Sequence, residues 1–133
     1  MRSKGQMKEH ILVVDDEAPI RDLLGEFFRR RGYTVTTAAT GEDALRLADE
    51  VVLQLVILDI ALPDADGLEL LESIKSGHPN LPVIVLTGMG FDGELLREAL
   101  QKGAAGYVSK TLPLDQLLME VHRVLSPKNG THA

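Results

Sequence analysis

The chain has 133 residues, of which 44% are hydrophobic and none is cysteine, and it carries a formal net charge of −6. This length suits one domain with its own core, and the absence of cysteine excludes disulfides, iron–sulfur clusters and thiolate zinc sites. The acidic balance argues against direct nucleic-acid binding, no apolar run reaches the roughly 18 residues of a membrane span and no signal peptide is visible, so we expect a cytoplasmic domain without membrane contact.

Short apolar runs alternate with longer segments of helical periodicity along the chain. The runs lack strict polar alternation, which is typical of parallel strands that are buried on both faces. We therefore predict five strands, at residues 11–14, 34–38, 55–58, 83–86 and 107–108.

Five apolar stripes at helical spacing predict helices between and after these strands. Glycines at 32, 77 and 103 are expected to end the first, third and fourth helices. Asp92 is a candidate N-cap of the fourth helix, and Pro113 suits the first turn of the fifth. The stripe positions are, in chain order, Ile20, Leu23, Leu24, Phe27, Phe28, Ala44, Leu45, Ala48, Leu68, Leu71, Ile74, Leu95, Leu96, Ala99, Leu100, Leu114, Leu117, Leu118, Val121 and Leu125.

Five strands that alternate with five helices predict an α/β fold, a doubly wound (βα)5 domain with a parallel sheet and helices on both faces. We assign this domain to residues 10–126, with a disordered leader at 1–9 and a polar tail at 127–133. In such folds ligands bind at the carboxyl ends of the strands. The functional prediction therefore depends on the polar residues that follow the strands.

Polar side chains do follow the predicted strands. Asp15 and Asp16 come after the first, Asp59 after the third, Thr87 after the fourth and Lys110 near the end of the fifth. Because the carboxyl ends of parallel strands meet at one edge, we expect three acids, a hydroxyl and an amine to converge there. Taken singly, each has an ordinary interpretation as a helix cap, a turn residue or a surface lysine. Their coincidence at equivalent positions favours a functional site.

The predicted cluster has a defined chemistry. Neighbouring carboxylates raise one another's pKa, and the usual compensation is a cation. Oxygen ligands without histidine or cysteine suit Mg²⁺, and Lys110 would add a fixed positive charge. A cation, an amine and a hydroxyl around one carboxylate can stabilise a phosphoryl group in transfer, and carboxylates can accept phosphoryl groups. Asp59 is the natural acceptor because it ends the strand expected at the centre of the sheet.

Four segments resemble the response-regulator receiver domain of two-component signalling. They read ILVVDDE at 11–17, LVILDIALPDADGLELL at 55–71, PVIVLTG at 82–88 and GAAGYVSK at 103–110. The string D-x-x-L-P-x-x-D-G at 59–67 is a specific signal, and the resemblance covers nearly the whole chain. It implies a flavodoxin-like, five-stranded parallel sheet in the order 2-1-3-4-5.

The resemblance also implies roles for the site residues. Asp59 would accept a phosphoryl group from the phosphohistidine of a histidine kinase or phosphotransfer protein, and Lys110 would pair with a phosphoryl oxygen. Mg²⁺ would be bound by Asp16 directly, by Asp59 and by the backbone carbonyl of Ala61. Asp15 would bind it mainly through water.

Thr87 and Tyr107 match the switch residues of receiver domains. On phosphorylation, Thr87 would turn toward the phosphoryl group and Tyr107 would turn inward. This would alter the face formed by the fourth helix, the fifth strand and the fifth helix. The resemblance implies a partner or a phosphorylation-linked homodimer at that face, although an aromatic in a strand can also be plain core packing.

The sequence departs from the receiver pattern at three places. Thr111 follows Lys110, where many receivers have a proline. Ala61 and Met89 lie two residues past the acceptor and past Thr87, and neither side chain can hydrogen-bond an attacking water, so we predict slow autodephosphorylation. Residues 89–93 include two glycines and are predicted to form a mobile loop.

The sequence leaves other interpretations open. A phosphatase of the haloacid-dehalogenase type also forms an aspartyl phosphate, but that group has an aspartate where Ala61 stands here. A flavin or nucleotide binder needs a glycine- or hydroxyl-rich phosphate loop after the first strand, and the acidic segment at 15–17 is neither. A degenerate receiver would act only as an interaction module. The domain can stand alone or be part of a longer regulator.

Overall fold

The computed structural model describes residues 9–88, 92–110 and 113–126. Met89 and Thr111, the polar tail and all but the last residue of the expected leader lie outside these ranges, as do residues 89–91 of the loop predicted to be mobile. Within the described part of the chain, no helix is long and apolar enough to cross a membrane.

Five parallel strands form one sheet in the order β2-β1-β3-β4-β5, as the fold prediction and the resemblance implied. The strands are β1 (His10–Val14), β2 (Thr34–Ala38), β3 (Leu55–Asp59), β4 (Val83–Thr87) and β5 (Gly106–Ser109). The order reverses at β1, which pairs with β2 on one side and with β3 on the other. The central strand is therefore β3, and Asp59 is its last residue.

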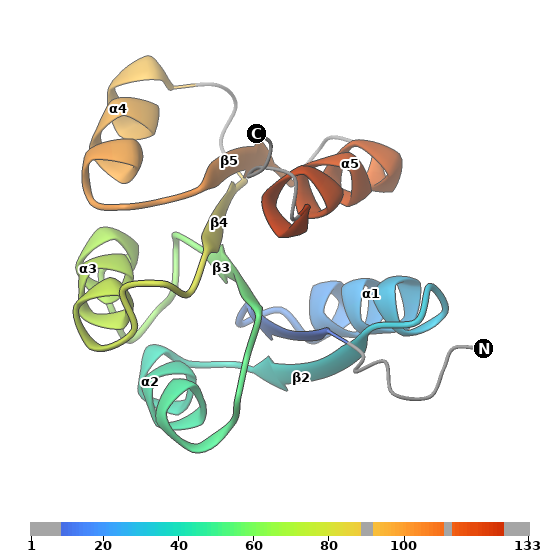
Figure 1. Cartoon of the computed structure of the whole chain (residues 1–133). Helices are drawn as coiled ribbons and strands as arrows, with labels where there is room; N and C mark the ends of the chain where they lie inside the picture. The colour runs from blue at the N-terminus through green and yellow to red at the C-terminus, as the bar shows by residue number, and fades with distance from the viewer. Residues whose placement is uncertain (1–8, 89–91, 111–112, 127–133) are drawn as a thin grey trace.

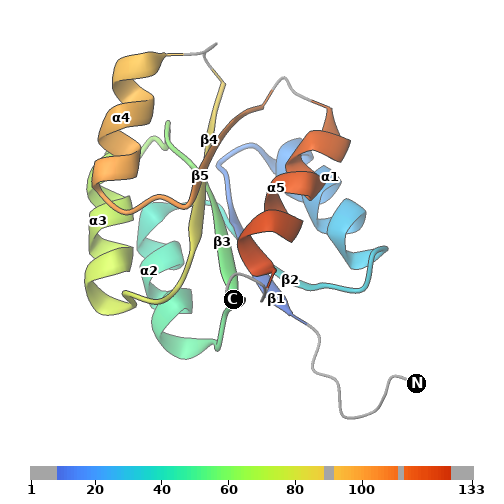
Figure 2. The same ribbon diagram turned by 45° about the horizontal axis from the view of Figure 1, so that its top comes forward.

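Helices cover both faces of the sheet. They are α1 (Ala18–Arg29), α2 (Gly41–Glu50), α3 (Gly67–Gly77), α4 (Gly93–Gln101) and α5 (Leu114–Leu125). Figure 1 and Figure 2 show α1 and α5 on one side and α2, α3 and α4 on the other.

Each face of the sheet has its own hydrophobic core. In β1, Leu12 and Val14 belong to the cluster beneath α2, α3 and α4, whereas Ile11 and Val13 belong to the cluster beneath α1 and α5. All four side chains are fully buried. This two-sided burial is the reason that the strands read as continuous apolar runs rather than as alternating ones.

The helices differ in detail from the stripe prediction. Leu23, Leu45 and Leu100 are 51%, 37% and 50% exposed, although each was placed on an apolar stripe. A stripe of this kind spans a wider arc than the contact with the sheet, so residues at its edge face solvent.

The predicted helix ends are nearly right. Asp92 caps α4 by accepting hydrogen bonds from two backbone amides, as predicted. Gly77 is the last residue of α3, as predicted, whereas Pro113 is the N-cap of α5 rather than part of its first turn. Gly32 and Gly103, which follow α1 and α4, adopt the left-handed backbone conformation that favours glycine.

Candidate functional site

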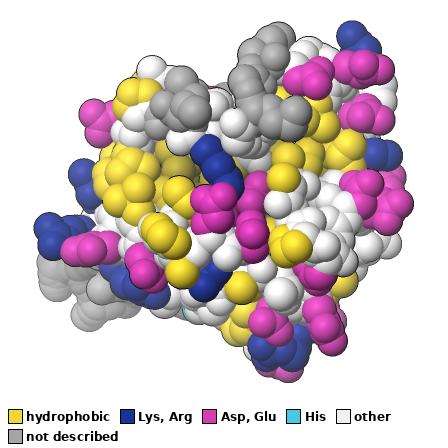
Figure 3. All heavy atoms as spheres, turned by 180° about the vertical axis from the view of Figure 1, so that it is seen from behind, with side chains coloured by type: hydrophobic (Ala, Val, Ile, Leu, Met, Phe, Trp, Pro, Cys, Tyr) yellow, Lys and Arg dark blue, Asp and Glu magenta, His cyan; other side chains and the backbone are white. Residues whose placement is uncertain are grey.

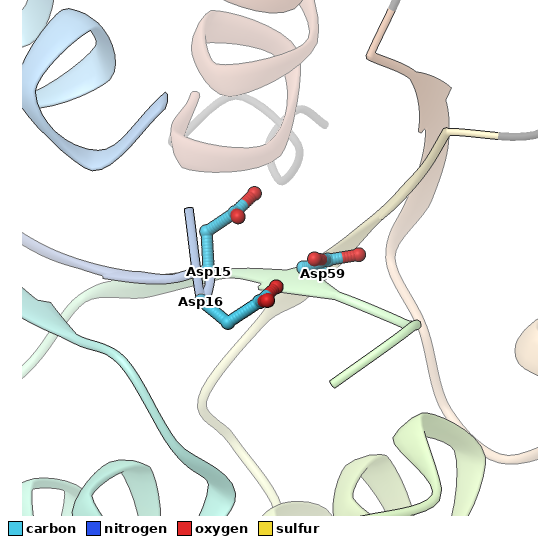
Figure 4. Close-up of side chains that lie close together, drawn as sticks. All are labelled: Asp15, Asp16 and Asp59. Carbon is cyan, nitrogen blue, oxygen red and sulfur yellow. The ribbon is translucent and has the colours of Figure 1, made fainter. Parts of the chain in front are cut away.

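The sheet brings the predicted site residues to one edge. Asp15 and Asp16 directly follow β1, Asp59 and Thr87 end β3 and β4, and Lys110 directly follows β5. Figure 4 shows the three aspartates gathered at the neighbouring ends of β1 and β3. On the face seen in Figure 3, basic and acidic side chains adjoin near the centre.

The three carboxylates are close enough to share one cation. One oxygen from each of Asp15, Asp16 and Asp59 lies within 4.8 Å of the other two. Asp15 and Asp59 are buried, at 0% and 1% exposure, while Asp16 is exposed. The cluster is therefore open to solvent through Asp16, and its floor is made of desolvated carboxylates.

Lys110 supplies the positive charge at this edge. Its Nζ lies 2.9 Å from Oδ2 of Asp15 and 3.0 Å from Oδ2 of Asp59. Burial lowers the pKa of Lys110, but the hydrogen bonds and charges of the two aspartates outweigh burial and raise it above 10.5. The ammonium form of Lys110 is therefore maintained at neutral pH.

For the pKa of Asp15, in contrast to that of Lys110, the effect of burial outweighs the effect of the neighbouring charges and hydrogen bonds. Burial is the largest influence and raises the pKa of its carboxyl, with a further increase from the nearby charge of Asp59. The ammonium of Lys110 and the backbone amide of Glu17 act against that increase without cancelling it. The Asp15 carboxylate is thus only partly compensated, and an additional cation would stabilise it.

Asp15 is held from three directions, two through its backbone and one through its side chain. Its amide donates to the carbonyl of Ala38 on β2 at 3.0 Å, and its carbonyl accepts from Nη1 of Arg21 on α1 at 2.7 Å. Its Oδ1 accepts from the amide of Glu17 at 2.9 Å. The β1–α1 turn that carries the acids is therefore tied to both the neighbouring strand and the following helix.

The structure of the loop after Asp59 gives a reason for three positions of the D-x-x-L-P-x-x-D-G motif, namely Asp59, Asp66 and Gly67. Oδ1 of Asp59 accepts from the amide of Ala61 at 3.0 Å, and Asp66 caps α3 through the amides of its first turn. A Cβ added at Gly67 would lie 2.2 Å from the carbonyl oxygen of Ile60. Only glycine fits this close approach of the helix start to the residue after Asp59.

Sequence reasoning missed two contacts that brace the site. Arg21 reaches back to the carbonyl of Asp15, and Asp64 accepts from the amide of Gly41 at 2.9 Å, which joins the loop after Asp59 to the start of α2. The local sequence contains no sign of either pairing, because each depends on how separate elements pack.

Thr87 and Tyr107 lie on neighbouring strands beside the cluster. Thr87 is fully buried, and its carbonyl accepts from the amide of Lys110 at 2.8 Å. Tyr107 packs against the core beneath α4, and its buried hydroxyl has no hydrogen-bond partner among the described residues. An unsatisfied buried hydroxyl costs roughly 1–3 kcal/mol.

The residues fit a bound Mg²⁺. Three carboxylates lie together and only two of them, Asp15 and Asp59, pair with the ammonium of Lys110. Within the described ranges, Oδ2 of the buried Asp15 has this ion pair but no hydrogen bond of good geometry. Oxygen ligands with an exposed side, through which water can complete the coordination, suit Mg²⁺. The carbonyl of Ala61 is two residues from Asp59 on the adjoining loop.

Comparison with protein families decides the class of this domain. Residues 11–122 match the family model described as the response regulator receiver domain. The chain belongs to the receiver domain family. This confirms the resemblance of the four sequence segments, and it places the chain among the signalling domains of two-component systems.

Some relatives are about as long as this receiver domain, and others are much longer proteins of which it matches only a part. Sporulation initiation phosphotransferase F of Bacillus subtilis is 35% identical over 124 residues, which are 93% of this chain and 99% of that protein. Transcriptional regulatory protein ZraR of Salmonella typhimurium is 35% identical over 95% of this chain, which spans only 28% of ZraR. A CheY-like receiver domain protein from Methanospirillum hungatei, 31% identical, superimposes with a TM-score of 0.87 over 92% of this chain and 98% of that one.

Proposed function

We propose that this receiver domain accepts a phosphoryl group on Asp59 from the phosphohistidine of a histidine kinase or phosphotransfer protein. The observation that carries the proposal is the position of Lys110, whose ammonium lies about 3 Å from both buried carboxylates. Such an ammonium beside a buried carboxylate can neutralise the oxygens of an incoming phosphoryl group. The domain would catalyse only its own phosphorylation and dephosphorylation, in the cytoplasm.

The transfer step conserves the phosphoryl group. A carboxylate oxygen of Asp59 attacks phosphorus while the phosphorus–nitrogen bond of the phosphohistidine breaks, and the bonding electrons return to the imidazole. The product is an acyl phosphate on Asp59. Lys110 holds its proton throughout and offers it as a hydrogen bond to a phosphoryl oxygen, in keeping with its raised pKa.

Asp15, Asp16, Asp59 and the carbonyl of Ala61 would hold Mg²⁺, with Asp15 acting mainly through water. The bound cation would neutralise negative charge on the carboxylates and on the phosphoryl oxygens. The support for this assignment is the proximity of the three carboxylates and the incomplete compensation of Asp15.

Phosphorylation would be read out through Thr87 and Tyr107. The added charge and acceptor oxygens would attract the hydroxyl of Thr87 and shift the packing of Tyr107 on the next strand. Tyr107 also lines a hollow of about 440 Å³ between α4 and α5, beside the exposed side chains of Leu100 and Met119. An output partner or a second phosphorylated copy would bind at this α4–β5–α5 face.

The direct test is the intact mass after incubation with acetyl phosphate, with and without Mg²⁺. Wild type should gain one phosphoryl group only with Mg²⁺, and Asp59→Asn should gain none. Asp64→Asn is the matched control, because Asp64 lies on the same loop but its carboxylate accepts from the amide of Gly41 at the start of α2. No addition to wild type would favour a degenerate receiver that acts only as an interaction module.

A further inference from the structure

Arg21 makes a contact that its position in α1 does not require. It lies in the second turn of the helix, close to the positive end of the helix dipole, where a cation gains nothing from that dipole. Its side chain is half-buried and turns back toward the sheet, and Nη1 donates to the carbonyl oxygen of Asp15 at 2.7 Å. This short contact joins the helix to the end of β1.

The turn between β1 and α1 lacks the side-chain N-cap that commonly fixes the start of a helix. The N-cap of α1 is Glu17, and the described structure shows no hydrogen bond from its side chain to the helix amides. The acids at 15 and 16 are thus carried by a turn whose helix end is not capped in the usual way. Arg21 supplies the missing link, because it fixes the carbonyl of the peptide that joins Asp15 to Asp16.

We propose that Arg21 is a positioning residue for the metal site of this receiver domain. Its guanidinium fixes the Asp15–Asp16 peptide, and this orients both carboxylates for a divalent cation. The inference rests on the proposed function in that the cation is the Mg²⁺ assigned above. Groups behind metal ligands characteristically change metal affinity by about tenfold to a hundredfold when removed.

The chain offers a matched control in the same helix. Arg29 lies at the other end of α1, and its Nη2 donates to the carbonyl oxygen of Val35 at 3.0 Å. Both arginines therefore bind a backbone carbonyl six residues away, but only Arg21 binds one beside the acids. Arg29→Met removes the same charge and the same kind of contact without touching the turn at 15–17.

The experiment measures Mn²⁺ binding by electron paramagnetic resonance, with Mg²⁺ as the competitor, on the full chain. We expect Arg21→Met to weaken binding of both ions about tenfold, Arg21→Lys to weaken it less, and Arg29→Met to leave it within about twofold of wild type. The Glu17 amide donates a hydrogen bond to Oδ1 of Asp15, and its hydrogen exchange should quicken in Arg21→Met but not in Arg29→Met.

Phosphorylation by acetyl phosphate gives a second measure. Most of the rate lost in Arg21→Met should return at saturating Mg²⁺, because the defect is in affinity rather than in the chemical step. Wild-type affinity in Arg21→Met, or an equal loss in Arg29→Met, would overturn the proposal. If Arg21→Met does not fold, wild-type affinity in Arg21→Lys overturns it instead.

The two proposals fail in different ways. A wild type that binds Mn²⁺ but is never phosphorylated contradicts the proposed function, and the comparison of Arg21 with Arg29 still decides the role of Arg21. A wild type that binds neither ion contradicts both.

Discussion

Two partly buried lysines at opposite ends of the sheet show how differently the two ends are built. Lys75, near the amino end of β4, donates to the carbonyls of Pro79 at 2.8 Å and Leu81 at 2.9 Å. Burial lowers its pKa, since its partners are neutral. Lys110, at the carboxyl end of β5, contacts two carboxylates, and these raise its pKa although burial alone would lower it.

The same contrast extends to the other polar groups. At the amino end, His10 binds Thr36 through its ring at 2.7 Å and Gln54 through its amide at 2.7 Å, so that polar atoms are matched by neutral partners. At the carboxyl end, carboxylates outnumber the ammonium that they share, and Asp15 is incompletely compensated. Perturbed, unbalanced charges of this kind gather where proteins bind ligands or perform chemistry.

The largest expected effect is a difference in phosphorylation rate between substitutions of the two lysines. Lys110→Met should slow phosphorylation by acetyl phosphate by about 100-fold to 1,000-fold at saturating Mg²⁺, because it removes the positive charge beside Asp59. Lys75→Met is the matched control and should keep the wild-type rate, while it loses about 1 kcal/mol of unfolding free energy. Initial rates by intact mass measure the first effect, and equal rates in the two variants would remove the functional distinction between the ends.

The next effect compares the two ends of α3. Gly67→Ala places a Cβ within 2.2 Å of the carbonyl oxygen of Ile60 and should cost about 3 kcal/mol or more. At Gly77, no described atom lies within 4 Å of an added Cβ, apart from the chain neighbours and the nearby backbone of α3 itself, so Gly77→Ala should be neutral or slightly stabilising. Urea unfolding of both variants measures the difference. A small effect at Gly67 would mean that the loop between Asp59 and α3 is less tightly packed than the structure shows.

The lifetime of the acyl phosphate gives a third, smaller effect. The Ala61 side chain is exposed and cannot hydrogen-bond water, so we predict slow dephosphorylation of wild type. Ala61→Asn supplies an amide that can orient water and should shorten the half-life about tenfold, whereas Ala61→Val should not. Decay of the phosphorylated mass after removal of acetyl phosphate measures this. Rapid decay of wild type would contradict the prediction.

The smallest expected effect is the contribution of Lys75 to the pH dependence of the unfolding free energy. Its folded-state pKa lies below the ordinary value of 10.5, so between these two values the unfolded chain binds more protons than the folded chain. Stability from this group should therefore rise with pH through that window. The difference in urea midpoint between wild type and Lys75→Met should follow this rise. A difference that stays level toward pH 10.5 would contradict this, because it would show that the carbonyls fully compensate the burial of the ammonium.

Much of this architecture is predictable from the sequence. The strands at the centre of the sheet are readable because both of their faces are buried, and Asp15, Asp59 and Thr87 follow from the rule that chemistry lies at the carboxyl ends of parallel strands. Burial at the edges of the helix stripes is harder to predict, because the sequence does not indicate how much of an apolar stripe the sheet covers. Leu23 and Leu100 are examples.

The contacts that brace the site are not predictable in this way. Arg21 binds a backbone carbonyl, and because every residue has one, the sequence does not indicate which carbonyl it binds. Asp64 binds the amide of Gly41 across 23 positions of sequence. Such pairings are set by the placement of whole elements, and only the resulting structure identifies them.

The most direct test of the contrast between the two ends is an amide NMR spectrum of wild type before and after adding Mg²⁺ and beryllofluoride, a phosphoryl mimic. We predict that the largest shifts lie at 15–17, 59–61, 87–88 and 107–110, with little change around His10, Lys75 and Gly103. Equal shifts at both ends, or none at the carboxyl end, would contradict the account.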